Sequence, residues 1–355
     1  MTRVKVYQPS NVLEAARARV SRVVDEFDRP VVSFSGGKDS LVVLHLFLQE
    51  YQRRGLGPLD AVFLDEEVIP DTVINFVEGY RSRGDLRLTW AVVPQDAQEY
   101  VLGRVNQFTM WDPARAGRWV RDKPASYWEG PDPTRVWDFP TEAPELFAQV
   151  YPGEALAVCT GVRAAESLVR WRVCVSKLGP DSWIHPSAHP NAKTAKPIYD
   201  WQENDVFKYL HDHGITYCPI YDHQMWAGHH YRVAPALTPE MAKSFEIWRA
   251  LDPGFYDRLA QAFPESTTNR YFHDMDRTVP ESVTYLDCWR YIRENIPAGH
   301  HKDVMRGMRS AMSVVDHHPQ GHKAFPPRHL MKWLMGGTWW NQPTALTYWS
   351  DDDDS

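Results

Sequence analysis

The chain has 355 residues and a formal net charge of −7, with 43% hydrophobic and 24% charged residues. This composition predicts a folded globular protein of about two domains and excludes an intrinsically disordered chain. The acidic balance argues against a protein that coats nucleic acid, and no run of about 18 apolar residues predicts a membrane-spanning helix. Four cysteines without a CxxC pair, and a start without an apolar secretory signal, favour a reducing cytoplasm.

The first hundred residues alternate between helical and extended patterns. Apolar residues at helical spacing predict a helix over residues 11–28, with Ser10 or Asn11 as its N-cap. Buried strands are expected over residues 30–35, 61–64 and 86–93, and helices over residues 41–49 and 70–80. This alternation predicts a right-handed, mostly parallel α/β sheet.

Residues 106–142 interrupt the alternation with four tryptophans and five prolines. We call this segment the tryptophan-rich insertion and expect it to be ordered, because flexible linkers are not rich in tryptophan. The sheet is expected to resume over residues 155–160 and to end with a strand over residues 195–199. Between them we expect a helix from Ala164 and a polar, mobile loop over residues 186–194. A helix over residues 201–213 ends at Gly214.

From about residue 235 the pattern is mostly helical, with helices expected over residues 239–251, 253–263, 281–295 and 300–315. We therefore predict a sheet domain over residues 1–234, a helical extension over residues 235–335 and an irregular acidic tail over residues 336–355. Adjacent histidine pairs occur at residues 229–230, 300–301 and 317–318. Neighbouring residues on a helix point apart, so these pairs predict no metal site.

A glycine-rich hexapeptide lies between the first predicted strand and the second predicted helix. Two glycines let backbone N–H groups point at a ligand, and the helix N-terminus adds positive potential there. The spacing matches neither GxxxxGK[ST] nor GxGxxG. Two hydroxyls and a lysine complete a loop that suits pyrophosphate; the alternative is a turn that binds nothing. Its residues are Ser35, Gly36, Gly37, Lys38, Asp39 and Ser40.

This hexapeptide resembles the PP-loop of the adenine-nucleotide α-hydrolase superfamily of ATP pyrophosphatases. Further segments are similar to the phosphoadenosine phosphosulfate (PAPS) reductase-like branch: Leu64-Asp65 with residues 70–72, GVRAAES at 161–167 with Arg170, and KPIYDW at 196–201 with residues 205–206. The resemblance covers roughly residues 28–225. It implies a Rossmann-like, five-stranded, mostly parallel sheet between helices, with the nucleotide across the carboxyl ends of the strands.

The resemblance also implies roles for individual residues, with ATP as the nucleotide and Mg²⁺ as its counter-ion. It implies catalytic roles for Lys38, Asp39 and Arg163. It implies nucleotide binding by Ser35, Gly36, Gly37, Ser40, Asp65 and Gly161. Asp65 could instead cap the next helix, and Glu166 could pair with Arg170 as structural support.

One departure from the family pattern bears on the reaction. PAPS reductases carry a C-terminal Glu-Cys-Gly-Leu-His segment whose cysteine attacks the sulfonate, and this chain has no such segment. We therefore expect cleavage of ATP at the α-phosphate, with pyrophosphate release and adenylyl transfer to an unknown acceptor. Sulfate activation and sulfur modification of a nucleic acid both fit. The alternatives are a thiol-dependent sulfonucleotide reductase and a non-catalytic, nucleotide-binding regulatory module.

The possible partners follow from charge. Residues 301–335 carry an excess of lysine and arginine, which could contact nucleic-acid phosphates or could form a solvated helix face. The sequence leaves open a homo-oligomer or a partner subunit, and it predicts no membrane partner.

Overall fold

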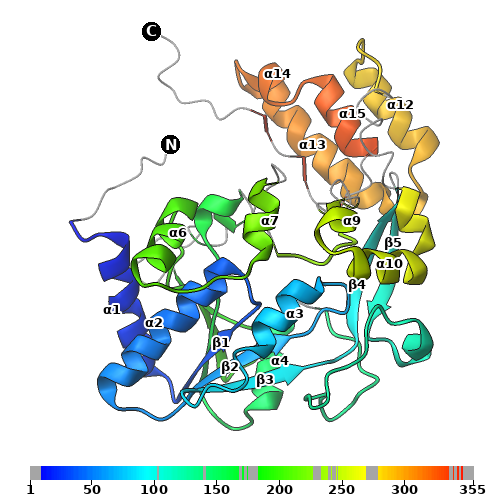
Figure 1. Ribbon diagram of the computed structural model, residues 1–355. Helices are drawn as coiled ribbons and strands as arrows, with labels where there is room; N and C mark the ends of the chain where they lie inside the picture. The colour runs from blue at the N-terminus through cyan, green and yellow to red at the C-terminus, as the bar shows by residue number, and fades with distance from the viewer. Residues whose placement is uncertain are drawn as a thin grey trace.

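The computed structural model describes residues 9–101, 104–138, 141–167, 170–171, 174, 183–226, 233–238, 241, 245, 247–268, 279–335, 339, 342–343 and 345–346. Most of the predicted tail over residues 336–355 lies outside them, as does most of the helix expected from Ala164. Within the described part, a sheet flanked by helices forms the larger body and a helical bundle forms the smaller one (Figure 1).

A six-stranded sheet, counted over the described residues, has the order β3-β2-β1-β6-β8-β7. Five neighbouring strands run parallel, and β7 pairs antiparallel with β8. The predicted parallel α/β fold is therefore confirmed, with one antiparallel edge strand added. The strands are β1 (Arg29–Ser33), β2 (Leu59–Leu64), β3 (Leu86–Ala91), β6 (Leu156–Cys159), β7 (Ile184–Pro186) and β8 (Ala192–Ala195).

Helices cover both faces of the sheet because successive strand residues point to opposite sides. Val32, Phe63 and Ala157 pack in one core with apolar residues of α1 (Val12–Glu26), α2 (Lys38–Arg54), α3 (Asp71–Glu78) and α6 (Glu203–Asp212). Val31, Val62 and Val158 pack in a second core with α4 (Ala143–Val150). Both faces are thus buried, as the continuous apolar runs of these strands predict.

Two helix boundaries show how well capping signals predicted the ends. Asn11 is the N-cap of α1, and its Oδ1 accepts the Glu14 N–H at 2.9 Å, which confirms one of the two residues expected there. Gly214 follows α6 in the left-handed conformation, with a φ of +60°. However, α2 begins at Lys38, earlier than the predicted Leu41, because its polar first turn belongs to the glycine-rich loop.

A hairpin that the sequence did not predict begins before the tryptophan-rich insertion and extends into it. Its strands are β4 (Gln95–Val101) and β5 (Arg104–Met110), so the first residues of the insertion are extended. A 3₁₀ turn, η1 (Pro113–Arg118), follows. The chain then runs beside the outer strand β3, where Trp128 forms a β-bridge with Ala91. A second bridge joins Trp137 to Gln95.

The end of the sheet differs from the prediction. The last parallel strand is β8, which ends at Ala195, whereas we expected a strand over residues 195–199. Part of the predicted polar loop over residues 186–194 is therefore strand. The Ser187 hydroxyl stabilises the tight β7–β8 turn by donating to the Ala192 carbonyl at 2.7 Å. A polar sequence forms strand here because β6 supplies backbone partners, which outweighs intrinsic propensity.

The C-terminal part contains two groups of helices. α9 (Ile247–Leu251) and α10 (Pro253–Ala262) pack against the sheet core, whereas α12 (Tyr285–Asn295), α13 (His301–His317) and α15 (Pro327–Met335) share a separate core. The short elements are η2 (Ala164–Glu166), α7 (Ile220–Trp226), η4 (Ala298–His300) and α14 (Gly321–Ala324). None of the helices in the described part of the chain has the length and apolarity needed to cross a bilayer.

Candidate functional site

The glycine-rich loop joins the carboxyl end of β1 to the first turn of α2. Gly36 has a φ of +73°, which a residue with a Cβ rarely adopts, and a Cβ there would lie 2.7 Å from Cγ2 of Val77. Gly37 is the N-cap of α2, so the unpaired N–H groups of a 17-residue helix begin at the loop. This arrangement provides partial positive charge where an anion would bind.

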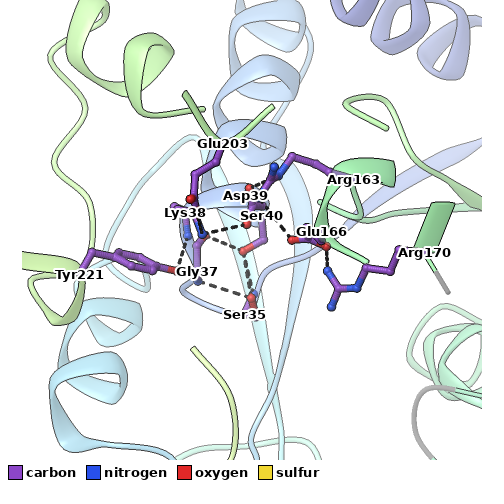
Figure 2. A network of polar contacts seen from close by, with 10 residues as sticks. All are labelled: Ser35, Gly37, Lys38, Asp39, Ser40, Arg163, Glu166, Arg170, Glu203 and Tyr221. Carbon is purple, nitrogen blue, oxygen red and sulfur yellow. Dashed lines mark hydrogen bonds and ion pairs between the residues drawn. The ribbon is translucent and has the colours of Figure 1, made fainter. Parts of the chain in front are cut away.

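Hydrogen bonds inside the loop fix its shape. The Ser35 N–H donates to Oγ of Ser40 at 3.2 Å, and the Gly37 N–H donates to Oγ of Ser35 at 3.4 Å. The Ser40 hydroxyl donates to the Gly37 carbonyl at 2.9 Å. Three of the predicted nucleotide-binding residues, Ser35, Gly37 and Ser40, are therefore joined in one turn (Figure 2), and Gly36 lies between the first two in the chain.

Gly161 brings the end of β6 against the first turn of α2. A Cβ at Gly161 would lie 2.6 Å from both the carbonyl carbon of Asp39 and the nitrogen of Ser40. Since these are backbone atoms, they cannot move aside as a flexible side chain could. Gly161 thus contacts the loop through its backbone, and the residues that follow it are carried to the edge of the site.

Arg163 and Asp39 form the central ion pair of the site. Nε of Arg163 donates to Oδ1 of Asp39 at 2.6 Å, and its Nη2 lies 3.5 Å from Oε1 of Glu166. The Arg163 side chain is only 4% exposed. Glu166 also pairs with Arg170, as one interpretation of the sequence expects. Figure 2 shows this chain of alternating charges running away from the loop.

Two residues that the sequence analysis missed complete the site. Glu203, in the first turn of α6, has Oε1 3.2 Å from Nζ of Lys38. Tyr221, in α7, accepts the Lys38 N–H through its hydroxyl oxygen at 2.8 Å. Burial raises the pKa of Tyr221, so its hydroxyl stays protonated. Glu203 lies within the KPIYDW…DV region that resembles the family, which is a signal that could have found it.

Asp65 lies outside this network. Its carboxylate is fully buried, pairs with Arg121 of the tryptophan-rich insertion and accepts Nε1–H of Trp90 at 2.7 Å. Asp65 does not cap α3 either, whose N-cap is Pro70. The structure therefore groups Lys38, Asp39, Arg163 and the loop residues, and leaves Asp65 as a contact that secures the insertion.

Glu66, the next residue in the chain, has different surroundings from Asp65. Glu66 is half-buried, and its carboxylate has no hydrogen-bond or ion-pair partner among the described residues. Desolvation, followed by the nearby Asp65 charge, raises the pKa of Glu66 to about 7. Glu67 turns back towards the insertion, where it accepts the Trp111 N–H and pairs with Arg115. Burial also raises the pKa of Asp65, but Asp65 has Arg121 and Trp90 as partners, whereas no such partner is found for Glu66 among the described residues.

The geometry suits a polyphosphate. Lys38 and Arg163 are buried cations beside the first N–H groups of α2, and charge-assisted bonds from such groups to phosphate oxygens are strong. Asp39 supplies a carboxylate at the same point. Mg²⁺ in nucleotide sites is usually held by one or two carboxylates together with phosphates and water. Among the described residues, no group of three or more potential metal ligands occurs, so the donors fit Mg²⁺ only in that way.

Known proteins resemble this chain over more than half of its length. A sequence model of the phosphoadenosine phosphosulfate reductase domain matches residues 29–259. The uncharacterized protein YbdN of Escherichia coli is 28% identical in an alignment of 272 residues that covers 71% of this chain and 65% of that protein. Sulfate adenylyltransferase subunit 2 of Mycobacterium sp. strain KMS is 26% identical in an alignment of 226 residues that covers 59% of this chain and 63% of that protein. The chain thus spans slightly less than two thirds of either relative.

Among solved structures, FMN adenylyltransferase of Candida glabrata with FAD and inorganic pyrophosphate has a TM-score of 0.38 at 21% identity, over 62% of this chain and 64% of that chain. PAPS reductase of Candida auris has a TM-score of 0.35 at 14% identity, over 65% of this chain and 97% of that one. The family model matches residues 29–259, which are more than half of the chain. The chain therefore belongs to the phosphoadenosine phosphosulfate reductase domain family.

Proposed function

We propose that this protein binds ATP through residues 35–40 and cleaves it at the α-phosphate, releasing pyrophosphate and transferring the adenylyl group. An acceptor oxygen attacks the α-phosphorus, and the bond from that phosphorus to the oxygen bridging to the β-phosphorus breaks. Pyrophosphate leaves with the electron pair, and any acceptor proton goes to solvent. Such a reaction needs positioning and charge stabilisation more than covalent chemistry from the protein.

The glycine-rich loop carries this proposal. Its turn, the N-terminus of α2 and the buried cations Lys38 and Arg163 provide donors for a leaving pyrophosphate. Similarity to sulfate adenylyltransferase subunit 2 supports adenylyl transfer as the reaction class. Mg²⁺ would neutralise phosphate charge when bound, and Asp39 is the carboxylate nearest to the loop that could help to hold it.

The cysteines favour adenylyl transfer over reduction of a sulfonucleotide. All four are buried, namely Cys159, Cys174, Cys218 and Cys288. Burial raises the pKa of Cys218 and of Cys288 to about 11, so their reactive thiolate forms are scarce at neutral pH. A thiol-dependent reductase needs an accessible thiolate, which none of these residues provides.

The test uses ATP labelled at the α-phosphate and identifies the product that carries this phosphate. The protein is incubated with Mg²⁺ and labelled ATP, with either sulfate or RNA as the acceptor, and nucleotide products are identified by mass spectrometry. We expect pyrophosphate and an adenylylated product or AMP, and we expect Lys38→Met to abolish both. Lys208→Met is the matched control, because Lys208 is an exposed lysine of α6 that pairs with Asp212.

Other outcomes would replace the proposal. Sulfite formation from a sulfonucleotide, lost in a cysteine variant, would establish a reductase. ATP binding without pyrophosphate release under any of these conditions would indicate a regulatory module. The word "subunit" in the name of the mycobacterial relative motivates repeating the assay with a candidate partner protein added. Nucleic acid as the acceptor, and a cytoplasmic location, remain predictions.

A further inference from the structure

Glu203 occupies the position beside Lys38 where an anion would bind. Its Oε1 lies 3.2 Å from Nζ of Lys38, closer than Oδ2 of Asp39, which lies at 3.5 Å. The backbone N–H of Lys38 is already bonded to the Tyr221 hydroxyl oxygen at 2.8 Å. The ammonium group of Lys38 thus contacts an oxygen from α6, and its backbone N–H donates to an oxygen from α7 (Figure 2).

The exposure of the two partners differs sharply. The Lys38 side chain is 4% exposed, whereas the Glu203 side chain is 45% exposed. Lys38 is therefore enclosed by protein, with its Nζ 5.1 Å from the ring centroid of Tyr221 and 5.9 Å from that of Phe207. Glu203 is the half-exposed partner of the pair, so its carboxylate can leave Lys38 for solvent.

Glu203 favours the start of α6 through its charge in the first turn, but it is not the residue that caps the helix. Gln202 is the N-cap, its side chain accepts from the Asp205 backbone, and the Asp205 carboxylate accepts the Gln202 N–H at 2.7 Å. This reciprocal capping box satisfies the helix end without the Glu203 carboxylate. The contact with Lys38 is consequently the specific interaction that the structure gives this side chain.

We propose that Glu203 is an internal anion that pairs with Lys38 and competes with a bound polyphosphate for it. A carboxylate and a phosphate are both acceptors for the same ammonium group, so the two compete. The inference rests on the proposed function, because it assumes that residues 35–40 bind the phosphates of a nucleotide. It assigns Glu203 a role in setting phosphate affinity, which is separate from any role in the chemical step.

The test measures pyrophosphate and ATP affinity by isothermal titration calorimetry. We expect Glu203→Gln to bind inorganic pyrophosphate about three- to tenfold more tightly, the change expected when a partly exposed competing ion pair of about 1 kcal/mol is removed. Asp212→Asn is the matched control: it removes one negative charge from the other end of the same helix, where Asp212 pairs with Lys208. This control should change affinity by less than about twofold, because exposed charges at that distance are screened.

A double variant separates this inference from the proposed function. If Glu203 acts through Lys38, adding Glu203→Gln to Lys38→Met should restore no affinity. Unchanged or weaker pyrophosphate binding by Glu203→Gln alone would overturn the inference, as would an equal gain from Asp212→Asn. If Lys38→Met binds pyrophosphate and ATP as well as the unaltered protein does, the loop assignment itself fails. Circular dichroism of each variant checks that its fold is retained.

Discussion

The lack of a side chain at Gly161 allows β6 to lie close to the glycine-rich loop. The predicted Cβ contacts of 2.6 Å involve the backbone of α2, so Gly161→Ala must push β6 and the loop apart. We expect Gly161→Ala to weaken ATP binding at least tenfold and to lower the free energy of unfolding by roughly 1–3 kcal/mol, the range for overpacking. Calorimetry and chemical denaturation measure the two effects. Gly117→Ala is the control, because a Cβ there meets nothing within 4 Å.

Arg163 and Arg170 provide a second test at the residue scale. Arg163 is buried and bonded to Asp39, whereas Arg170 is 41% exposed and pairs with Glu166. Lysine cannot reproduce the planar fork of a guanidinium. Arg163→Lys should therefore cost roughly 1–3 kcal/mol in kcat/KM for pyrophosphate release. Arg170→Lys should cost about 0–1 kcal/mol. The reverse order would mean that Arg170 contacts the substrate and Arg163 serves as scaffold.

Glu66 predicts a pH dependence of stability. Desolvation raises its pKa in the folded protein to about 7, above the usual 4.5 of an exposed glutamate. Between these two values the unfolded chain loses the proton first, so stability falls as the pH rises. Glu66→Gln should remove this loss. The change that it makes in the free energy of unfolding should therefore be roughly 1–3 kcal/mol more favourable at pH 8 than at pH 4. Urea denaturation at both pH values measures it, and equal effects at both would contradict the raised pKa.

At the scale of elements, the tryptophan-rich insertion is fastened by buried charges that follow β2. Asp65 pairs with Arg121, and both side chains are almost fully buried. Burial raises the pKa of Asp65, and the Arg121 charge opposes that rise. Arg121→Met should destabilise the fold by about 3–5 kcal/mol, because Asp65 must then take up a proton or stay charged without its partner. Adding Asp65→Asn should recover part of this loss. Thermal unfolding of the single and double variants measures the coupling, and strictly additive effects would show that the pair does not act as a unit.

The elements that the sequence predicted correctly are those whose signals lie within their own residues. Apolar runs identified β1, β2, β3 and β6, and the cap at Asn11 and the glycine at Gly214 marked helix ends. The strand β8 was placed wrongly and β7 was missed, because their pairing depends on β6, far away in the sequence. The hexapeptide revealed the loop, but the contacts of Glu203 and Tyr221 with Lys38 arise only when α2, α6 and α7 pack together.

At the scale of the whole molecule, the separate cores predict stepwise unfolding. The sheet body buries Phe47, Phe63 and Trp201, whereas the bundle of α12, α13 and α15 buries its own Val304, Met308 and Leu330. Calorimetry should resolve two transitions, and saturating ATP should raise only the one that belongs to the sheet body.

Met308→Ala is the complementary variant for this prediction. It deletes a fully buried side chain of α13 and should lower only the transition of the bundle, since large-to-small changes in a core cost about 2–5 kcal/mol. A single transition that both ATP and Met308→Ala shift would mean that the two bodies unfold as one cooperative unit. The division between the sheet body and the bundle of α12, α13 and α15 would then have no thermodynamic meaning.

The bridge between Trp128 and β3 has a consequence for how the protein behaves in solution. The Trp128 N–H donates to the Trp90 carbonyl at 2.7 Å, and the Trp128 carbonyl accepts the Val92 N–H at 2.8 Å. These two bonds pair the carboxyl end of the edge strand β3, where exposed strand groups could otherwise pair with another chain. We therefore expect the insertion to hinder edge-to-edge association at that end of the strand. Proteins engineered to shorten the insertion would expose a hydrogen-bonding rim and tend to form fibrils or precipitate, even where nucleotide binding is retained.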